Sequence, residues 1–545
     1  MKKRFKMLIS LTSISAIAAL PLVAASCVNS QNKETNVSNL EVYKQFNQFI
    51  NDTHGRKAEN INNFKESNLV LEKNGDKIAK SLGIKLTNGQ SLTTAALDPL
   101  YDQDVTIDPS HNIYGSYHAY RVLKKMIAAM GYENHTGDNI TYPDQNIINN
   151  QKNQAAPDSK ITDLGVTSIT TFKDGGKHQA IVNKANEDMK KTGFITQGFL
   201  YETANNRTNN IGNNIIVTIN PSDKVLKNSK NVNRAVKDFY ISSHYDSTNN
   251  VGPKGISWGA TDNATGVSVN LSLLKYFSDP KNRENLGVRL HILFVDAEEL
   301  GKLGSEAFVE QFLKSKKQGN NEANELLKNS IGMINLDTVA GGDRMYVHSP
   351  NTDPNLARGG RIYGNVSKII RDQINAISRI RSEKLKDPSQ ELEIHPQFTP
   401  GEYKPGETGD WSDHAPFYIK ANIPVAYIES TNFAIKSKTE VYDGYAQTTN
   451  PNAWVLKDGK NIESLVKRKI NNGLIEVYDW PEGITKKDFA ISGDIWHSDL
   501  DRPDWVLKNI GSRFYKQQDT VYESLKEYFA SMYSINDKDE IQYII

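Results

Sequence analysis

Histidines and acidic residues recur at short spacings in the middle and the last third of this 545-residue chain. The segments that carry them read HYD at 244–246, GATDNATG at 259–266, AEELGKLGS at 297–305, NLD at 335–337, SDHAPF at 412–417 and WHSDLD at 496–501. Imidazoles and carboxylates are nitrogen and oxygen ligands of Zn²⁺-like ions, and a single cysteine excludes a thiolate cluster. Such a set could hold two ions joined by a bridging carboxylate, with a water between them whose pKa is lowered.

Each segment also has an ordinary structural explanation when it is taken alone. On an extended chain His244 and Asp246 share a face, so Asp246 could orient a metal-bound imidazole or simply form a surface pair. Asp262 lies between glycines that let the backbone approach closely, and it could equally cap the helix that follows. Consecutive acids after an apolar strand, as at Glu298 and Glu299, are costly to bury without a cation nearby. In a metal site, the acid that does not bind metal, Glu298, could take the proton from the water.

Alternating strands and helices are expected to position these residues. Apolar runs predict strands at 213–219, 238–243, 289–295, 331–336 and 425–428, and helical spacing predicts helices at 117–130 and 266–277. Uniformly apolar strands are typical of an α/β sheet that helices cover on both faces. Because reactive side chains collect at the strand ends of such sheets, we expect the acidic segments to meet there.

The N-terminus has the layout of an export signal. Basic residues at 2–6 precede an apolar stretch at 7–25, which ends in small residues directly before the only cysteine, Cys27. This layout resembles a bacterial lipoprotein signal and implies cleavage before Cys27 and acylation of its thiol. We therefore expect a lipid-anchored protein on the extracellular face of the membrane. A secreted protein with an incidental cysteine is the alternative.

The mature chain divides by composition. We predict a signal peptide over 1–26, a flexible tether over 27–42, a polar N-terminal extension over 43–100, and a catalytic domain over 101–545 with loop-rich insertions near 350–405 and 431–490. The composition, 38% hydrophobic and 24% charged, is that of an ordinary soluble protein. A net charge of +1 argues against a dedicated nucleic-acid-binding protein, which would usually carry a basic excess.

The order of the six segments resembles peptidase family M28, the zinc metallopeptidases. That family includes co-catalytic aminopeptidases and, as a non-peptidase relative, glutaminyl cyclase. The resemblance is strong over about 235–345, extends in patches to 502, and does not include 28–100. It implies a three-layer sandwich with a mixed, largely parallel central sheet flanked by helices, and two Zn²⁺ ions per chain.

The resemblance also implies a role for each matching residue. His244 and Asp337 would bind one metal ion, Glu299 and His497 the other, and Asp262 would bridge the two. The second histidine ligand has a rival in the SDHAPF segment, His414. The family pattern favours the later histidine.

The remaining site residues follow from the same resemblance. Glu298 would be the general base, and Asp246 would orient the first histidine ligand. Asp413 and His414 would line the site without binding metal. Trp496 stands where several aminopeptidases carry a tyrosine that stabilises the oxyanion, which leaves the oxyanion donor open between the metal and backbone N–H groups. The other histidines are interpreted as surface or structural residues: 54, 111, 118, 135, 178, 291, 348 and 395.

Together these features predict a surface-anchored zinc exopeptidase that hydrolyses N-terminal residues of peptides or proteins. One alternative is a glutaminyl cyclase-like acyltransferase on the same fold, and another is a non-catalytic peptide-binding or adhesion lipoprotein. Cyclases generally work with one zinc ion, so a complete set of five ligands favours two ions and hydrolysis. Missing ligands would mark a protein that only binds, and none of the five is missing.

Overall fold

The computed structural model describes residues 37–53, 115–136, 161–162, 177–203, 206–231, 235–248, 257–313, 325–350, 364–395, 404–435, 446–470, 472–473, 475–535 and 541–543. The predicted signal peptide, Cys27 and most of the predicted extension lie outside these residues. The lipid attachment and the domain division therefore stay predictions. None of the helices in the described ranges combines the length and the apolar character needed to cross a bilayer.

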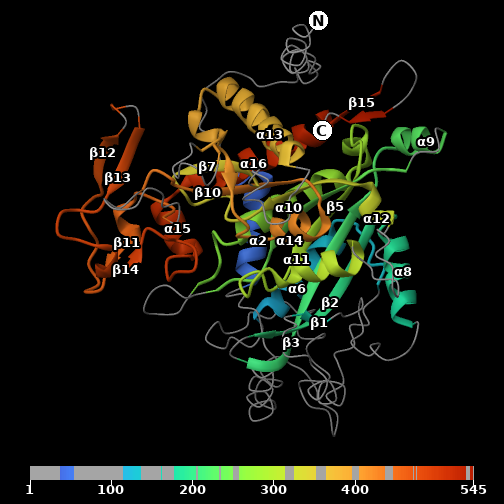
Figure 1. The fold of residues 1–545 in the computed structure, drawn as a ribbon, viewed down its shortest axis with the longest axis horizontal. Helices are drawn as coiled ribbons and strands as arrows, with labels where there is room; N and C mark the ends of the chain where they lie inside the picture. Colours follow the sequence, from blue (N-terminus) through green and yellow to red (C-terminus); the bar gives the residue numbers. More distant parts are fainter. Residues whose placement is uncertain are drawn as a thin grey trace, which may run out of the picture.

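A ten-stranded mixed sheet forms the centre of the molecule (Figure 1). Its strands follow the order β1-β2-β3-β5-β4-β6-β10-β7-β8, and β9 pairs with β7 off this path. The four central strands β5, β4, β6 and β10 run parallel, whereas β3 and β7 pair antiparallel with the outer two of them. The strand bounds are β1 (Ile161–Thr162), β2 (Gly193–Thr203), β3 (Asn206–Ile219), β4 (Asp238–His244), β5 (Arg289–Val295), β6 (Ser330–Leu336), β7 (Arg344–Pro350), β8 (Leu392–Glu393), β9 (Glu407–Thr408) and β10 (Val425–Thr431).

Helices cover both faces of this sheet because its strands are apolar on both sides. In β4, Phe239 and Ile241 belong to one hydrophobic core, whereas Tyr240 belongs to a second core on the opposite face. The first core contains residues from α2 (Glu41–Asp52), α6 (Gly115–Ala129), α10 (Ala264–Ser278), α13 (Gly364–Leu385) and α16 (Ser512–Ser531). The second contains residues from α8 (Lys177–Asp188), α11 (Leu303–Phe308), the helical turn η5 (Val309–Leu313), α12 (Glu325–Asn329) and α14 (His414–Ala421). The predicted α/β three-layer sandwich is confirmed.

The parallel strands bring the acidic segments to one edge of the sheet. His244 is the last residue of β4, Glu298 and Glu299 follow β5, and Asp337 follows β6. Since these strands are hydrogen-bonded neighbours that run in the same direction, their carboxyl ends meet side by side. Asp262 reaches the same edge from the turn before α10.

Helix α2 was not predicted. It begins within the segment predicted as a tether, and Val42, Phe46 and Phe49 are fully buried in the first core. The ring of Phe46 lies 5.0 Å from that of Phe514 in α16. Its sequence reads as polar because only one face of the helix is apolar, and that face is the one that packs. Helix α2 thus packs in the same core as helices of the predicted catalytic domain.

The two predicted insertions contain more regular structure than expected. The segment near 350–405 contributes α13, whose Ile370 and Ile374 are fully buried on the sheet. The segment near 431–490 forms β11 (Trp454–Leu456), β12 (Val466–Ile470), β13 (Ile475–Asp479) and β14 (Phe489–Ser492), which stand beside the sheet around a small core of their own in Figure 1. The remaining elements are α9 (Asp223–Asn231), α15 (Pro503–Asn509), β15 (Tyr533–Ile535) and β16 (Ile541–Tyr543).

Candidate metal centre

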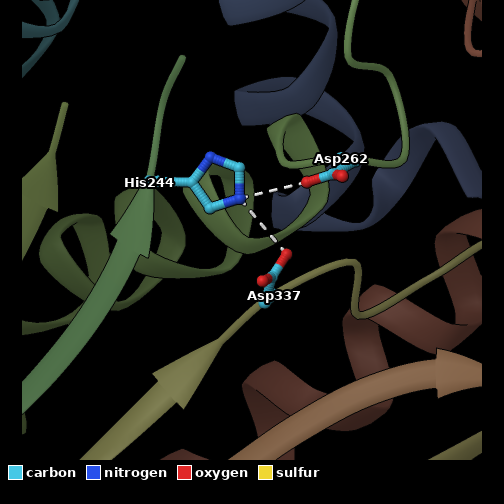
Figure 2. A group of neighbouring side chains, drawn as sticks. All are labelled: His244, Asp262 and Asp337. Carbon is cyan, nitrogen blue, oxygen red and sulfur yellow. Dashed lines mark hydrogen bonds and ion pairs between the residues drawn. The ribbon is translucent and has the colours of Figure 1, made fainter. Parts of the chain in front are cut away.

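Two groups of potential metal ligands lie at this edge of the sheet and share one residue. In the first, His244 Nε2 lies 3.0 Å from Asp262 Oδ1 and 3.2 Å from Asp337 Oδ1 (Figure 2). In the second, His497 Nε2 lies 3.0 Å from Asp262 Oδ2 and 2.9 Å from Glu299 Oε2. Asp262 therefore offers one oxygen to each group, which is the arrangement that a bridging carboxylate requires.

The backbone around Asp262 is fixed by the carboxylate of Asp501, from the WHSDLD segment. Asp501 accepts hydrogen bonds from the backbone N–H groups of Thr261 and Asp262, at 2.5 and 3.2 Å. Because this contact joins residues far apart in the sequence, it holds the turn that carries Asp262 against the segment that carries His497.

Asn263 ties the same turn to strand β6. Its Nδ2 donates to the carbonyl of Leu336 at 2.8 Å, and its Oδ1 accepts from the N–H groups of Gly266 and Thr338 at 3.0 and 3.1 Å. Gly266 is required at its position because a Cβ there would lie 2.7 Å from the Leu336 carbonyl oxygen. The close backbone approach that the glycines of this segment predicted is therefore present at Gly266.

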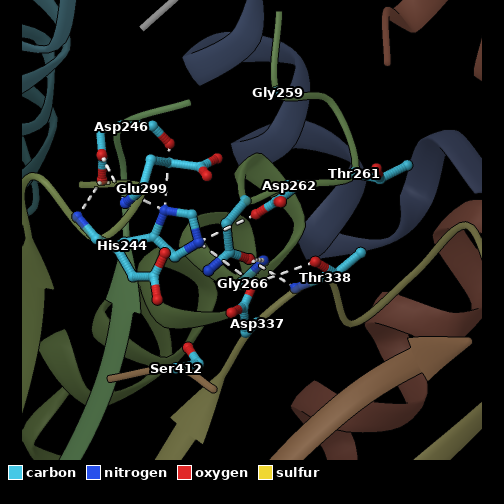
Figure 3. A network of polar contacts seen from close by, with 12 residues as sticks. His244, Asp246, Gly259, Thr261, Asp262, Gly266, Glu299, Asp337, Thr338 and Ser412 are labelled. Atoms are coloured by element: carbon cyan, nitrogen blue, oxygen red, sulfur yellow. Dashed lines mark hydrogen bonds and ion pairs between the residues drawn. The ribbon is translucent and has the colours of Figure 1, made fainter. Parts of the chain in front are cut away.

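Asp246 links the first histidine to the two glutamates. Its carboxylate accepts hydrogen bonds from the backbone N–H groups of Glu298 and Glu299, at 3.1 and 3.2 Å. His244 Nδ1 lies 3.2 Å from the Asp246 carbonyl oxygen and 3.4 Å from its Oδ1 (Figure 3). With Nδ1 held as the donor, Nε2 is left to face Asp262 and Asp337, as a metal-binding imidazole must. Asp246 is a positioning residue for both sides of the site.

Burial and mutual repulsion dominate the electrostatics of the acidic side chains. Burial raises the pKa of Glu299 to about 7, and the charge of Asp262 adds to that effect. Burial also raises the pKa of Glu298 well above its usual value; His244 opposes this, and Asp413 and other acids reinforce it. Buried carboxyl groups that crowd together in this way favour a bound cation.

The same acids raise the pKa of the two histidines, against the effect of burial. Burial acts to lower the pKa of His244, but the charge of Asp337 and contacts with three aspartates raise it well above its usual value. Burial acts in the same direction on His497, and contacts with Asp262 and Glu299 raise its pKa to about 12. Each imidazole thus lies where a cation is strongly favoured.

The donor set fits divalent zinc-like ions. It consists of imidazole nitrogens and carboxylate oxygens in two groups of three, and zinc accepts both kinds of ligand. Glu299 Oε1 is buried and has no hydrogen-bond partner among the described residues, so a coordination position at that oxygen is open. One group would be held by His244, Asp262 and Asp337, and the other by Asp262, Glu299 and His497.

Residues 214–459 match the sequence model of a family described as peptidase family M28. We call these matched residues the M28 segment. The M28 segment contains four of the five predicted ligands and Glu298, whereas His497 lies after its end.

Curated relatives and solved structures resemble parts of the chain. The alkaline phosphatase isozyme conversion protein of Escherichia coli (strain K12) is 30% identical over 191 residues, which are 35% of this chain and 44% of that protein. A probable leucine aminopeptidase of Trichophyton verrucosum is 29% identical over 127 residues, 23% of this chain and 32% of that protein. The chain thus spans less than half the length of these curated relatives. A zinc aminopeptidase structure from Bacillus subtilis superposes with a TM-score of 0.30 at 20% identity, covering 58% of this chain and 50% of that one.

The structure separates the two histidines that competed for the last ligand position. His497 lies in the second ligand group, whereas His414 Nε2 lies 2.9 Å from the carbonyl of Gly409 and its ring stacks on Tyr427. Asp413 is fully buried and belongs to neither group; burial raises its pKa to about 7, and His244 opposes that effect. Trp496 is half-buried, and its backbone N–H donates to Gln447.

Three residues near the metal centre were not among the predicted site residues: Asn263, Glu429 and Asp501. Asn263 and Asp501 are part of the quoted segments, but their hydrogen bonds to backbone depend on tertiary structure that no spacing reveals. Glu429 could have been found, because it follows the apolar run 425–428 just as Asp337 follows 331–336.

Proposed function

We propose that the chain is a zinc-dependent aminopeptidase that removes N-terminal residues from peptides or proteins. The observation that carries this proposal is the pair of ligand groups joined through Asp262, with Glu298 next to the ligand Glu299. The two groups would hold two zinc ions per chain. When bound, zinc would polarise the scissile carbonyl group and lower the pKa of water.

Glu298 is the residue that would move the proton. Its backbone N–H is held by Asp246, so its position relative to Glu299 and His244 is fixed. As water attacks the carbonyl carbon, the Glu298 carboxylate would accept the proton of that water. It would then give the same proton to the departing amine nitrogen as the C–N bond breaks.

The nature of the relatives supports a peptidase. The family whose model matches residues 214–459 is described as a peptidase family. One curated relative is named a probable leucine aminopeptidase. The sharing of Asp262 between two complete groups favours two ions, and therefore hydrolysis over the cyclase reaction that generally uses one. A protein that had kept only peptide binding would not need a complete set of ligands.

The experiment that tests the proposal is hydrolysis by the zinc-loaded protein of matched aminoacyl and N-acetyl-aminoacyl 4-methylcoumarin amides. We expect the fluorophore to be released only from the substrates that have a free amino group. This release should stop when a chelator removes the zinc. Cleavage of the N-acetyl compounds at the same rate would contradict an aminopeptidase. Conversion of an N-terminal glutamine peptide to pyroglutamate, without hydrolysis, would point to the cyclase instead.

The proposal includes a place of action outside the cell. It rests on the signal-like N-terminus and Cys27, which a lipid chain would anchor to the membrane. Replacing Cys27 by Ser should abolish incorporation of a labelled fatty acid into the protein, because the acylated thiol is lost. A Cys27→Ser protein that still incorporates the label as the wild type does would rule out this attachment.

A further inference from the structure

Beside the metal centre, one carboxyl group that takes no part in it is surrounded by aromatic rings. In the parallel pairing of β10 with β6, Tyr427 is opposite Asn335, so Glu429 and Asp337 follow at the next position on the same face. On its other side β10 pairs antiparallel with β7, which places Tyr346 opposite Glu429. Glu429 thus lies one strand away from a predicted metal ligand.

The aromatic cluster around Glu429 consists of Tyr346, His348, His395, Tyr427 and Phe433. The ring of Phe433 lies 4.9 Å from that of Tyr346 and 4.5 Å from that of His395. The ring of His348 stacks on Tyr427 with 5.5 Å between centroids. The histidines at 348 and 395, interpreted from sequence as surface or structural residues, are therefore buried members of this cluster.

Glu429 lacks a permanent cationic partner. Its Oε1 lies 2.8 Å from His348 Nε2, and its Oε2 accepts a hydrogen bond from the Tyr427 hydroxyl at 3.3 Å. Burial lowers the pKa of His348 to about 3, so that this imidazole is neutral at physiological pH. Within the described residues, no lysine or arginine forms an ion pair with Glu429.

The Glu429 carboxyl group is nevertheless within reach of a ligand. The Glu429 side chain is 12% exposed, as is that of the metal-site residue Asp337, whereas the His348 side chain is fully buried. Burial raises the pKa of Glu429 to about 7; the charge of Asp337 adds to the effect, whereas His395, the Tyr427 hydrogen bond and His414 oppose it. An approaching cation would therefore offset an existing electrostatic cost.

We propose that Glu429 and the aromatic cluster bind the ammonium or guanidinium group at the end of a lysine or arginine side chain in the substrate residue that is released. The inference rests on the proposed aminopeptidase function and names its substrate class. Adjacent strands lie roughly 4.8 Å apart, and a lysine side chain is long enough to extend from the metal edge to the neighbouring strand. A hydrogen bond to a charged group in such surroundings contributes about 1.5–3 kcal/mol, which is roughly a 10- to 150-fold preference.

The test compares lysine with its uncharged analogue of similar shape, norleucine. Lysyl and norleucyl 4-methylcoumarin amides, both with a free α-amino group, are hydrolysed by the zinc-loaded wild type, and we expect kcat/KM to favour lysine by roughly 30-fold. Glu429→Gln should reduce that ratio to near one. Glu393→Gln is the matched control, since Glu393 is a more exposed glutamate paired with Arg344 and its loss should leave the ratio in place.

Calorimetry with L-lysine and L-norleucine, the products that would be released, compares binding of the two side chains to the same proteins without turnover. Preferential lysine binding that Glu429→Gln removes would uphold the site even if no substrate were hydrolysed, in which case the aminopeptidase proposal alone fails. A wild type that hydrolyses both amides without preference would overturn the site while the aminopeptidase proposal stands. Equal losses on lysine and norleucine in Glu429→Gln would also overturn it, because the side-chain cation would then play no part.

Discussion

Replacing Glu298 by Gln is expected to lower kcat by about 10²- to 10⁴-fold while the protein still binds its zinc. Glutamine keeps the shape of the side chain, and the backbone N–H that Asp246 holds is unchanged. The amide cannot accept a proton from the attacking water, so the loss falls on the chemical step. KM should change little, because Glu298 is not one of the residues that hold the ions.

The measurement is steady-state hydrolysis of a free aminoacyl substrate, together with the zinc content of the same preparation. Glu284→Gln supplies a matched control, since Glu284 is exposed in the loop before β5. A Glu298→Gln protein with full zinc content and wild-type kcat would show that another group moves the proton.

Replacing Asp262 by Asn should have the widest effect on metal binding. Asp262 gives one oxygen to His244 and the other to His497, so its charge serves both ligand groups. The side chain keeps its size, but the bridging negative charge is lost. We expect zinc affinity to fall by more than the roughly 10- to 100-fold that loss of an outer-shell partner costs, and hydrolysis to fall with it.

The change in Tm that zinc produces distinguishes this result from simple unfolding. Zinc should raise the Tm of the wild type, because an ion that binds only the folded state stabilises it, and the shift should be much smaller for Asp262→Asn. Asp504→Asn, at a side chain that is 70% exposed, is the control with the same chemical change and should keep the full shift. An Asp262→Asn protein that binds two ions as tightly as wild type would contradict a shared bridging carboxylate.

The parallel core of the fold was predictable because its strands are apolar on both faces. The predicted strand at 289–295 coincides with β5, and that at 331–336 differs from β6 by one residue. Such strands can lie only in a covered sheet, and that fixed the expected position of the acids that follow them.

Other parts of the fold could not be predicted because their helices are apolar on one face only, and polar residues dominate their sequences. Helices α2 and α13 each bury one apolar face and expose many polar residues, so composition alone suggested a polar extension and a loop-rich insertion. The antiparallel strand β7 was not among the predicted strands, because polar residues and a proline interrupt the apolar run in its sequence, RMYVHSP.

The candidate site was predictable as a list of residues but not as an arrangement. Residue types and order indicated which side chains could hold metal, and the family pattern already favoured His497 over His414, whereas the distances between these side chains needed coordinates. His414 points to the carbonyl of Gly409, a contact that nothing in its own segment indicates. The aromatic cluster at Glu429 was missed because its members come from three separate segments, which meet only through the pairing of β7 with β10 and with β8.

The central claim is that two metal ions are held together through Asp262. The most direct measurement is a zinc titration of the metal-free chain, in which bound zinc per chain and aminopeptidase activity are followed in the same samples. We expect binding to reach two ions per chain, with full activity present only when both have bound. Saturation at one ion, or a folded protein that binds none, would contradict the account.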